Sequence, residues 1–293
     1  MPENKIIPVA VIIVNYKTEV LTRRALLALF SSSVQPQEVI LVDNNSEDNI
    51  ASIVKQEFPQ VKIIANKENL GFAKANNQAI RQFVTQPYVW LLNSDTETGE
   101  KSLEELYDFM VANPKVAALG PQLVYPTREL QPVGGYFPSI ANVFMYLIPF
   151  VIFLPKFLRR KLKTIVIFPQ LLPKESREID YVTGAAMFLR KEALDKVGLL
   201  CEDYFMYFEE TDLCLRLKQA GWEIKVVDTD PVMHVYGGSF KTKYDPKRLK
   251  IFLTSLKLFV EKNCTGFKKI MILAEIIILG PVSLLLKRFK SFV

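Results

Sequence analysis

Polar side chains follow three apolar runs in the first third of the chain. Asn15 ends the run that starts at Pro8, Asp43 ends a second run, and Asp95 follows a third. Parallel strands that end together would bring these residues to one sheet edge, where open α/β proteins bind their ligands. A carboxylate there suits Mg²⁺ or Mn²⁺ bridging two phosphates, because hard cations prefer oxygen ligands. Taken alone, Asp95 could instead cap a helix or a turn, and Asp43 could instead form a turn.

Three further acids, Glu209, Glu210 and Asp212, stand at the start of an amphipathic helical pattern. A carboxylate in this place can act as a general base that removes the proton of an attacking hydroxyl group. The competing interpretation is that the three acids only stabilise the helix, because its N-terminus carries the positive end of the helix dipole.

His234 is the single histidine of the chain. A lone histidine is usually structural, but this one follows a predicted strand and precedes Gly237-Gly238-Ser239. A turn of such small residues lets backbone N–H groups approach a phosphate closely. This setting favours a role for His234 in binding.

Alternating strands and helices must position these residues. Apolar, β-branched runs predict strands at residues 8–15, 38–43, 61–65, 88–92 and 116–119, with helices at 19–32, 47–58, 72–84 and 102–112. Later segments predict helices at 191–197 and 209–220 and a strand at 223–227. Strands separated by helices of this length indicate an α/β fold with a mostly parallel sheet.

Several other classes of protein are disfavoured by the sequence. No GxxxxGK[ST] motif occurs, which argues against a P-loop NTPase, and no GxGxxG follows the first strand, which argues against a dinucleotide-binding dehydrogenase. The three cysteines are an odd number and form no CxxC pair. A disulfide framework or a structural zinc site is therefore not expected, and a reducing compartment fits.

The formal net charge of +6 is concentrated near the C-terminus. Residues 241–293 hold twelve Lys and Arg and three acids, so this part carries +9 and the rest of the chain about −3. Ile270–Leu286 is apolar except for Glu275 and Ser283, is interrupted by Gly280-Pro281, and has cations on both sides. Because a helix of this length is short for a membrane span, we expect a half-inserted or in-plane helical pair. A short transmembrane helix and a docked soluble helix are the alternatives.

A second apolar segment lies in a proline-rich part of the chain where the alternating pattern degrades, from Pro126 to Ile179. Val143–Leu154 is apolar and is followed by five Lys and Arg between residues 156 and 163. It is too short to span a bilayer as a helix. An interfacial segment and a core helix with a basic end are both consistent with this pattern.

Seven segments, in order, resemble the family 2 inverting glycosyltransferases of the GT-A fold, and among them the rhamnosyltransferase-like branch. They are VIIVNYK at 11–17, VDNNS at 42–46, NLGFAKANN at 69–77, LLNSD at 91–95, TGAAMFLRK at 183–191, FEETDLCLR at 208–216 and HVYGGS at 234–239. Each segment is weak alone, but the ordered set covers most of residues 8–240. The resemblance implies a Rossmann-like GT-A domain over residues 1–240, with an apolar and basic insertion around 134–178. Residues 241–293 would then be a basic, amphipathic helical extension associated with a membrane.

The resemblance also implies roles in donor binding. Asp95 and His234 would hold Mg²⁺ or Mn²⁺, and Asp43 would accept the N3–H of a uracil or thymine ring. The remaining residues of the implied nucleotide site are Asn15, Asn69, Gly71, Asn76 and Ser94. The residues that would leave room for the donor sugar are Gly184 and Ala185.

For catalysis, the resemblance implies that Glu210 is the base, with Glu209 as the second candidate and Asp212 in a structural role. Two positions depart from the usual family pattern. Position 93 is Asn where the acidic triplet often begins with Asp, and position 210 is Glu where the family has Asp. The first departure removes one negative charge from the metal site, and the second lengthens the base by one methylene.

Together these features predict inverting transfer of a hexose or deoxyhexose from a UDP- or dTDP-sugar to a glycan. Rhamnose as the sugar rests on the resemblance, and a polyprenyl-linked acceptor rests on the apolar segments. We expect the enzyme at the cytoplasmic face of the cell membrane. A membrane-tethered, nucleotide-sugar-binding scaffold without turnover is the alternative that the two departures suggest. Nucleic-acid binding by the basic tail is disfavoured, because apolar runs would lie bare beside a polyanion.

Overall fold

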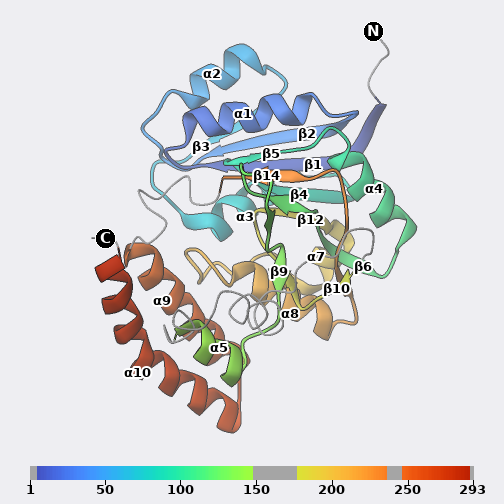
Figure 1. The fold of residues 1–293 in the computed structure, drawn as a ribbon. Coiled ribbons are helices and arrows are strands. Elements are labelled where there is room, and N and C mark those ends of the chain that lie inside the picture. Colours follow the sequence, from blue (N-terminus) through green and yellow to red (C-terminus); the bar gives the residue numbers. More distant parts are fainter. Residues whose placement is uncertain (1–4, 148–176, 236–245, 291–293) are drawn as a thin grey trace.

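The structure is a computed structural model that describes residues 5–147, 177–235 and 246–290. Within these ranges the main sheet has eight strands in the order β10-β13-β6-β12-β4-β1-β2-β3 (Figure 1). The strands are β1 (Lys5–Asn15), β2 (Val34–Asp43), β3 (Lys62–Ala65), β4 (Tyr88–Asn93), β6 (Val116–Gly120), β10 (Arg177–Glu178), β12 (Ala186–Arg190) and β13 (Glu223–Val226). From β3 to β4 every pair is parallel, and β12 is antiparallel to both β4 and β6. The mostly parallel α/β sheet expected from the sequence is confirmed.

β1 lies between β2 and β4 in this sheet, and its composition explains that place. Residues 9–13 are fully buried, as expected for a strand covered on both faces. Its pairing with β2 shifts register between Ile7 and Ala10, next to Pro8, whose missing N–H cannot take part in the ladder. After this shift the register continues to the pair Asn15–Asp43, so both predicted site residues end their strands together.

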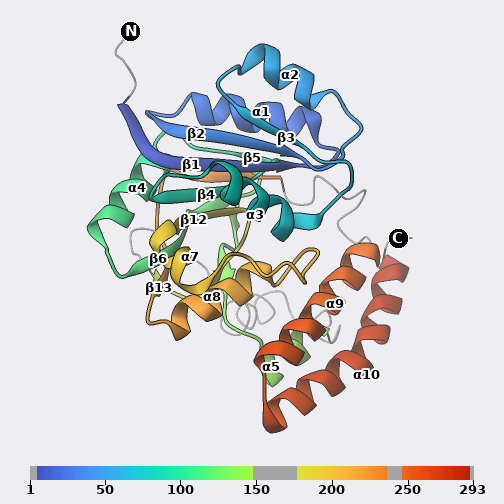
Figure 2. The same ribbon diagram turned by 180° about the vertical axis from the view of Figure 1, so that it is seen from behind.

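Helices cover both faces of the sheet. Figures 1 and 2 place α1 (Glu19–Phe30) and α2 (Ile50–Glu57) on one face, and α3 (Gly71–Phe83), α7 (Lys191–Val197) and α8 (Glu209–Gln219) on the other. α4 (Ser102–Ala112) packs beside β6. α2 begins at Ile50, three residues later than expected, and Ser46 does not cap it. The Ser46 hydroxyl instead accepts a hydrogen bond from Asn15.

A second sheet joins distant parts of the chain near the end of β4. Its strands, in the order β5-β14-β7-β8, are β5 (Thr96–Glu97), β14 (Val232–His234), β7 (Leu123–Val124) and β8 (Leu130–Gln131). A separate antiparallel pair consists of β9 (Gly134–Gly135) and β11 (Tyr181–Val182). Strands of two or three residues are too short to show a hydrophobic period, so the sequence pattern did not predict most of them.

α5 (Ile140–Leu147), α9 (Pro246–Asn263) and α10 (Gly266–Lys290) form a group beyond α8 (Figures 1 and 2). This group has its own apolar core, which includes Leu256, Phe259 and Ile272. The expected interruption at Gly280-Pro281 is wrong, because α10 continues through Pro281. Within the described ranges, none of the helices combines the length and the hydrophobicity that a membrane span requires.

The apolar segment Val143–Leu154 is described only in part. α5 covers its first residues, and Val143 and Leu147 are buried against the α9–α10 group. Residues 148–154 of this segment, the basic residues that follow it, and Gly237-Gly238-Ser239 lie outside the described residues.

Candidate active site

The carboxyl ends of β1, β2 and β4 form the rim that carries the predicted donor site. Asn15 and Asp43 are register partners at the ends of β1 and β2, and Val14 pairs with Asn93 at the end of β4. Nδ2 of Asn15 also donates to Oδ1 of Asp43 at 3.3 Å. The structure therefore brings together the residues that the sequence placed after three separate strands.

Asn15 lies beneath this rim and is fully buried. Its Oδ1 accepts hydrogen bonds from the hydroxyl groups of Thr18 at 2.9 Å and Thr22 at 2.7 Å. Its Nδ2 donates to Ser46 Oγ at 2.6 Å and to Asp48 Oδ2 at 3.3 Å. Because the amide is surrounded by partners from the chain itself, Asn15 is suited to orienting the Asp43 rim more than to contacting a ligand directly.

Ser94 belongs to the same network. Its hydroxyl lies 2.8 Å from the hydroxyl of Thr18, which in turn bonds to Asn15. Ser94 is buried, so its side chain links the end of β4 to the end of β1.

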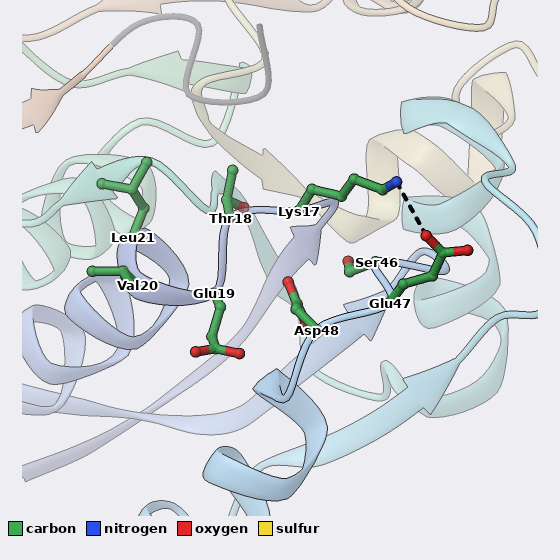
Figure 3. Close-up of a pocket in the computed structure, with 8 residues that line it drawn as sticks. All are labelled: Lys17, Thr18, Glu19, Val20, Leu21, Ser46, Glu47 and Asp48. Atoms are coloured by element: carbon green, nitrogen blue, oxygen red, sulfur yellow. Dashed lines mark hydrogen bonds and ion pairs between the residues drawn. The ribbon is translucent and has the colours of Figure 1, made fainter. Parts of the chain in front are cut away.

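A pocket of about 560 Å³ opens beside this network, and Figure 3 shows its lining. Its walls come from the loop after β1 with the start of α1, and from the loop after β2. The lining residues are Lys17, Thr18, Glu19, Val20, Leu21, Ser46, Glu47 and Asp48. The ammonium group of Lys17 and the carboxylate of Glu47 face each other at 3.3 Å, and both are more than half exposed. Ser46 and Asp48 connect the pocket to the Asn15–Asp43 pair.

Asn69 and Gly71 form a tight junction next to Asp43. Asn44 Nδ2 donates to Asn69 Oδ1 at 2.8 Å, and the N–H of Gly71 donates to the same oxygen at 2.9 Å. Gly71 has φ +80, and a Cβ there would lie 2.4 Å from the carbonyl oxygen of Phe205. Only glycine fits this place, because both the backbone angle and the space exclude a side chain.

Asn76 lies in α3, where its Nδ2 donates to the carbonyl of Phe72 at 2.9 Å, and it is buried. Of the three predicted junction residues, Asn69 and Gly71 thus lie beside the rim, whereas the Asn76 amide is used within its own helix.

Asp95 and His234 meet at the carboxyl end of β4. The antiparallel pairing of β14 with β5 places His234 opposite Thr96, next to Asp95. Nε2 of His234 lies 3.2 Å from Oδ1 of Asp95, and both side chains are buried. Nδ1 of His234 lies 2.6 Å from Oε1 of Gln131, whose Nε2 donates to the His234 carbonyl at 3.1 Å. An amide oxygen only accepts, so Nδ1 donates to Gln131 and Nε2 is the ring nitrogen that faces Asp95.

This pair fits a divalent cation that arrives with a phosphorylated ligand. Two ligand atoms that bind Mg²⁺ at about 2.1 Å and at a right angle lie about 3 Å apart, close to the observed separation. Among the described residues, no group of three or more His, Cys, Asp and Glu side chains could hold an ion. Mg²⁺ is commonly held by one or two protein ligands together with substrate phosphates, so Asp95 and His234 are sufficient for such a site.

Glu209 and Glu210 begin α8 after a strained stretch of backbone. Tyr207 has φ 69 and Phe208 has φ 70, in the left-handed region that bulky residues rarely adopt. Within the described part of the chain, Oε2 of Glu209 and Oε2 of Glu210 are buried and have no hydrogen-bond partner. Burial raises the pKa of Glu210 to about 7, and burial together with the charge of Glu210 raises the pKa of Glu209 well above its ordinary value. A carboxylate with a pKa near neutrality is suited to taking up a proton.

The pKa values of two other groups near Glu210 are also raised. Burial and the nearby Glu210 charge raise the pKa of Tyr181, and burial raises the pKa of Cys214 to about 12. Both groups therefore remain neutral around pH 7. Tyr181 lies in β11, which packs against α8.

Gly184 and Ala185 lie between the α8 side of the site and the end of β4. They follow β11 in the chain, and the carbonyl of Ala185 accepts the N–H of Asn93 at 2.8 Å. A Cβ at Gly184 would lie 3.2 Å from the ring of Phe72. The backbone of Gly184 and Ala185 thus passes close to Asn93 and to the ring of Phe72 with little side-chain bulk, which would leave room for a donor sugar.

Asp212 is engaged elsewhere. Its Oδ2 accepts from Nε of Arg216 at 2.9 Å, and its Oδ1 accepts from Nδ2 of Asn263 at 3.1 Å. The Arg216 guanidinium also donates to the carbonyls of residues 197–199. Asp212 thus joins α8 to α9 and to the end of α7.

The family model described as glycosyl transferase family 2 matches residues 10–198. This chain belongs to that family. The glycosyltransferase is 30% identical over 234 residues to the N-acetylglucosaminyl-diphospho-decaprenol L-rhamnosyltransferase of Mycobacterium tuberculosis H37Rv. The aligned part covers 76% of this chain and 75% of that protein. It is 24% identical over 275 residues, 89% of this chain and 77% of the other, to the low-salt glycan biosynthesis hexosyltransferase Agl10 of Haloferax volcanii.

The fold of the glycosyltransferase is similar to that of a mannosyltransferase from Pyrobaculum calidifontis, solved in complex with GDP-Man and Mn²⁺. The TM-score is 0.59 at 16% identity, over 96% of this chain and 73% of that one. These relatives confirm the predicted family, its rhamnosyltransferase-like branch and the GT-A class of fold.

Gln131 contacts the candidate site through His234, and the sequence did not indicate it. It lies in the proline-rich part of the chain, in a strand of two residues, so neither a motif nor a periodic pattern marked it. The threonines at 18 and 22 were missed as well, although their spacing of four within the start of a helix places both hydroxyl groups on one face.

Proposed function

We propose that this glycosyltransferase moves a hexose or deoxyhexose, with inversion, from a UDP- or dTDP-sugar to a glycan on a polyprenyl carrier. The main support for this proposal is that Asp95 and His234 lie side by side at the rim of the sheet in a family 2 glycosyltransferase. Support for the acceptor comes from the M. tuberculosis relative, whose name specifies a decaprenol-linked acceptor and L-rhamnose.

The residues divide the reaction between them. Asp43 and the adjacent pocket would bind the nucleoside, and Asp95 with His234 would bind a divalent cation. A bound Mg²⁺ or Mn²⁺ would offset the charge of the departing diphosphate. Glu210 would take the proton of the acceptor hydroxyl while that oxygen bonds to C1 of the sugar and the bond from C1 to the phosphate oxygen breaks. A single displacement of this kind inverts the configuration at C1.

A donor panel with Mn²⁺, repeated with chelator, tests this function. We expect transfer from one UDP- or dTDP-sugar and its loss with chelator. Glu210→Gln should lower kcat by about 10²–10⁴-fold while donor binding remains, because the amide cannot accept the proton. Donor binding without transfer to any candidate acceptor would instead identify a scaffold, and full activity of Glu210→Gln would refute its assignment as the base.

We also propose that α10 lies in the plane of an anionic membrane surface at the cytoplasmic face. Its exposed apolar residues recur at spacings that place them on one helical face. They are Phe267, Ile270, Ile277, Ile278 and Val282. Insertion of each large side chain contributes roughly 1.5–3 kcal/mol, and each cation near anionic lipid adds roughly 1 kcal/mol. The exposed Lys268 lies on the same helix.

Vesicle binding tests this location. Vesicles that contain phosphatidylglycerol should bind the unmodified chain, and Ile277→Glu should weaken this binding by about tenfold or more. Val111→Glu is the matched control, because Val111 is also exposed, but on α4. Equal vesicle binding by all three proteins would show that α10 is not the face that binds the membrane.

A further inference from the structure

α9 holds the segment that leads into α8 through two hydrogen bonds. Nε of Arg248 donates to Oη of Tyr207 at 2.8 Å. Oγ of Ser255 donates to the carbonyl oxygen of Met206, also at 2.8 Å, and Ser255 is buried. Both bonds end on residues that lie just before Glu209.

Aromatic packing joins the same two elements. The ring of Phe208 lies against Phe252 and Phe259 of α9, with centroids 5.2 Å and 5.6 Å apart. Tyr207 also meets Phe252 edge to face at 5.9 Å. Such pairs add about 0.5–1.5 kcal/mol each beyond the burial of their surface.

Contacts on both sides complete this attachment. Lys262 forms an ion pair with Asp203, and Asn263 donates to Asp212 in the first turn of α8. The residues from Asp203 to Asp212 are therefore bound to α9 before, within and after the turn that carries Glu209 and Glu210.

The backbone of this turn needs such support. Consecutive left-handed residues at Tyr207 and Phe208 cost of order 1–3 kcal/mol each and persist only when their surroundings hold them. In each of the two acids that follow, Oε2 is buried and has no hydrogen-bond partner among the described residues, so side-chain contacts of these oxygens do not hold the turn. The described contacts of α9 reach both strained residues.

We propose that α9 is a positioning element for the catalytic carboxylates, acting through Arg248 and Ser255 on the turn before Glu209 and Glu210. The proposal rests on the proposed function in that Glu210 is the base, with Glu209 as the second candidate. It assigns a catalytic purpose to a helix outside residues 10–198, the part that matches the family model. The helical extension would then set the geometry of the reaction in addition to any role at a membrane.

Ser255→Ala, compared with Thr254→Ala, is the first test. Both changes remove one hydroxyl group from α9, but Thr254 is exposed. We expect Ser255→Ala to lower kcat by about tenfold, with the donor KM within about twofold, because small misplacements of a reacting group reduce rates steeply. Thr254→Ala should match the unmodified enzyme. A rise in donor KM alone, or an unchanged kcat, would overturn the proposal.

Arg248→Gln is the second test, because this half-buried residue can be changed without opening the core. Its pH profile should differ from that of the unmodified enzyme. The midpoint of kcat should move down from about 7 toward the ordinary value of 4.5, because a displaced Glu210 becomes better hydrated. A variant that loses thermal stability but keeps both kcat and this midpoint would show a purely structural role.

Hydrogen exchange separates this proposal from the proposed function. Amide exchange in residues 204–212 should be faster in Ser255→Ala than in Thr254→Ala, since the turn loses its hydrogen bond. Equal exchange in the two variants would overturn the positioning role even if transfer is observed. An enzyme that transfers no sugar from any donor, but shows the faster exchange, would instead overturn the proposed function.

Discussion

Nε2 of His234 lies 3.2 Å from Oδ1 of Asp95, although the two residues are far apart in the chain. The short strands β5 and β14 create this relationship, because their pairing sets His234 opposite Thr96. Gln131 then fixes the ring by its bond to Nδ1. The candidate cation site is thereby completed by a sheet that lies outside the main parallel one.

Gln131 should therefore affect metal binding without touching the metal. Gln131→Ala removes the acceptor that orients the imidazole, and loss of such a partner typically lowers metal affinity by about 10–100-fold. The concentration of Mn²⁺ that gives half-maximal transfer should rise accordingly. Gln82→Ala, an exposed change on α3, should leave it unchanged. Equal Mn²⁺ requirements in the two variants would contradict the orienting role.

The rate of transfer should rise with pH through a midpoint of about 7. A base works only when deprotonated, and burial sets the pKa of Glu210 at about this value. The profile of kcat between about pH 5 and pH 9 measures the midpoint in the enzyme–substrate complex. A midpoint near the ordinary value of 4.5 would show that Glu210 is not buried during catalysis.

Stability should have the opposite dependence on pH. Because the pKa of Glu210 is higher in the folded chain than in the unfolded one, its charge destabilises the fold as pH rises from 4.5 to about 7. Glu210→Gln should increase the free energy of unfolding by roughly 1–3 kcal/mol at about pH 8. This gain should disappear below pH 4.5, where Glu210 is protonated in both states. Urea unfolding at both pH values measures the difference, and a gain independent of pH would contradict this account.

Gly71→Ala should destabilise the fold more than Gly221→Ala. Both glycines have positive φ, +80 and +86, so both variants bear the cost of a left-handed alanine, about 1 kcal/mol. Only at Gly71 would the new Cβ meet the Phe205 carbonyl oxygen at 2.4 Å, whereas at Gly221 nothing lies within 4 Å. We expect Gly71→Ala to lose about 2 kcal/mol or more beyond the control. If the two variants lose similar amounts of unfolding free energy in denaturant titrations, the backbone at Gly71 can shift to accommodate the new Cβ.

The sequence predicted the parts of this structure that have a period or a motif. β1 and β2 end where expected and β4 ends one residue later, because runs such as Val39–Val42 are apolar on both faces and are followed by polar residues. α8 ends at Gln219, one residue before the predicted end, and Gly221 follows with φ +86, an angle that glycine adopts readily.

What the sequence did not predict depends on contacts between distant segments. Gln131 gains its place from a two-residue strand, and the left-handed angles at Tyr207 and Phe208 arise where α9 packs on the turn. Local propensity did not indicate the left-handed angles, because bulky residues rarely adopt positive φ. The continuity of α10 through Pro281 is similar, since the helix packs against α5 and α9, which can compensate for one missing N–H.

We propose that Asp95 and His234 hold a divalent cation together with a sugar-nucleotide diphosphate. Calorimetric titration of UDP and dTDP, with Mn²⁺ and then with chelator, tests it most directly. We predict that Mn²⁺ tightens binding of one of them by about tenfold or more, and that Asp95→Asn and His234→Gln each abolish this gain but leave the metal-free affinity unchanged. Affinities that do not respond to Mn²⁺, or a gain that persists in both variants, would contradict the claim.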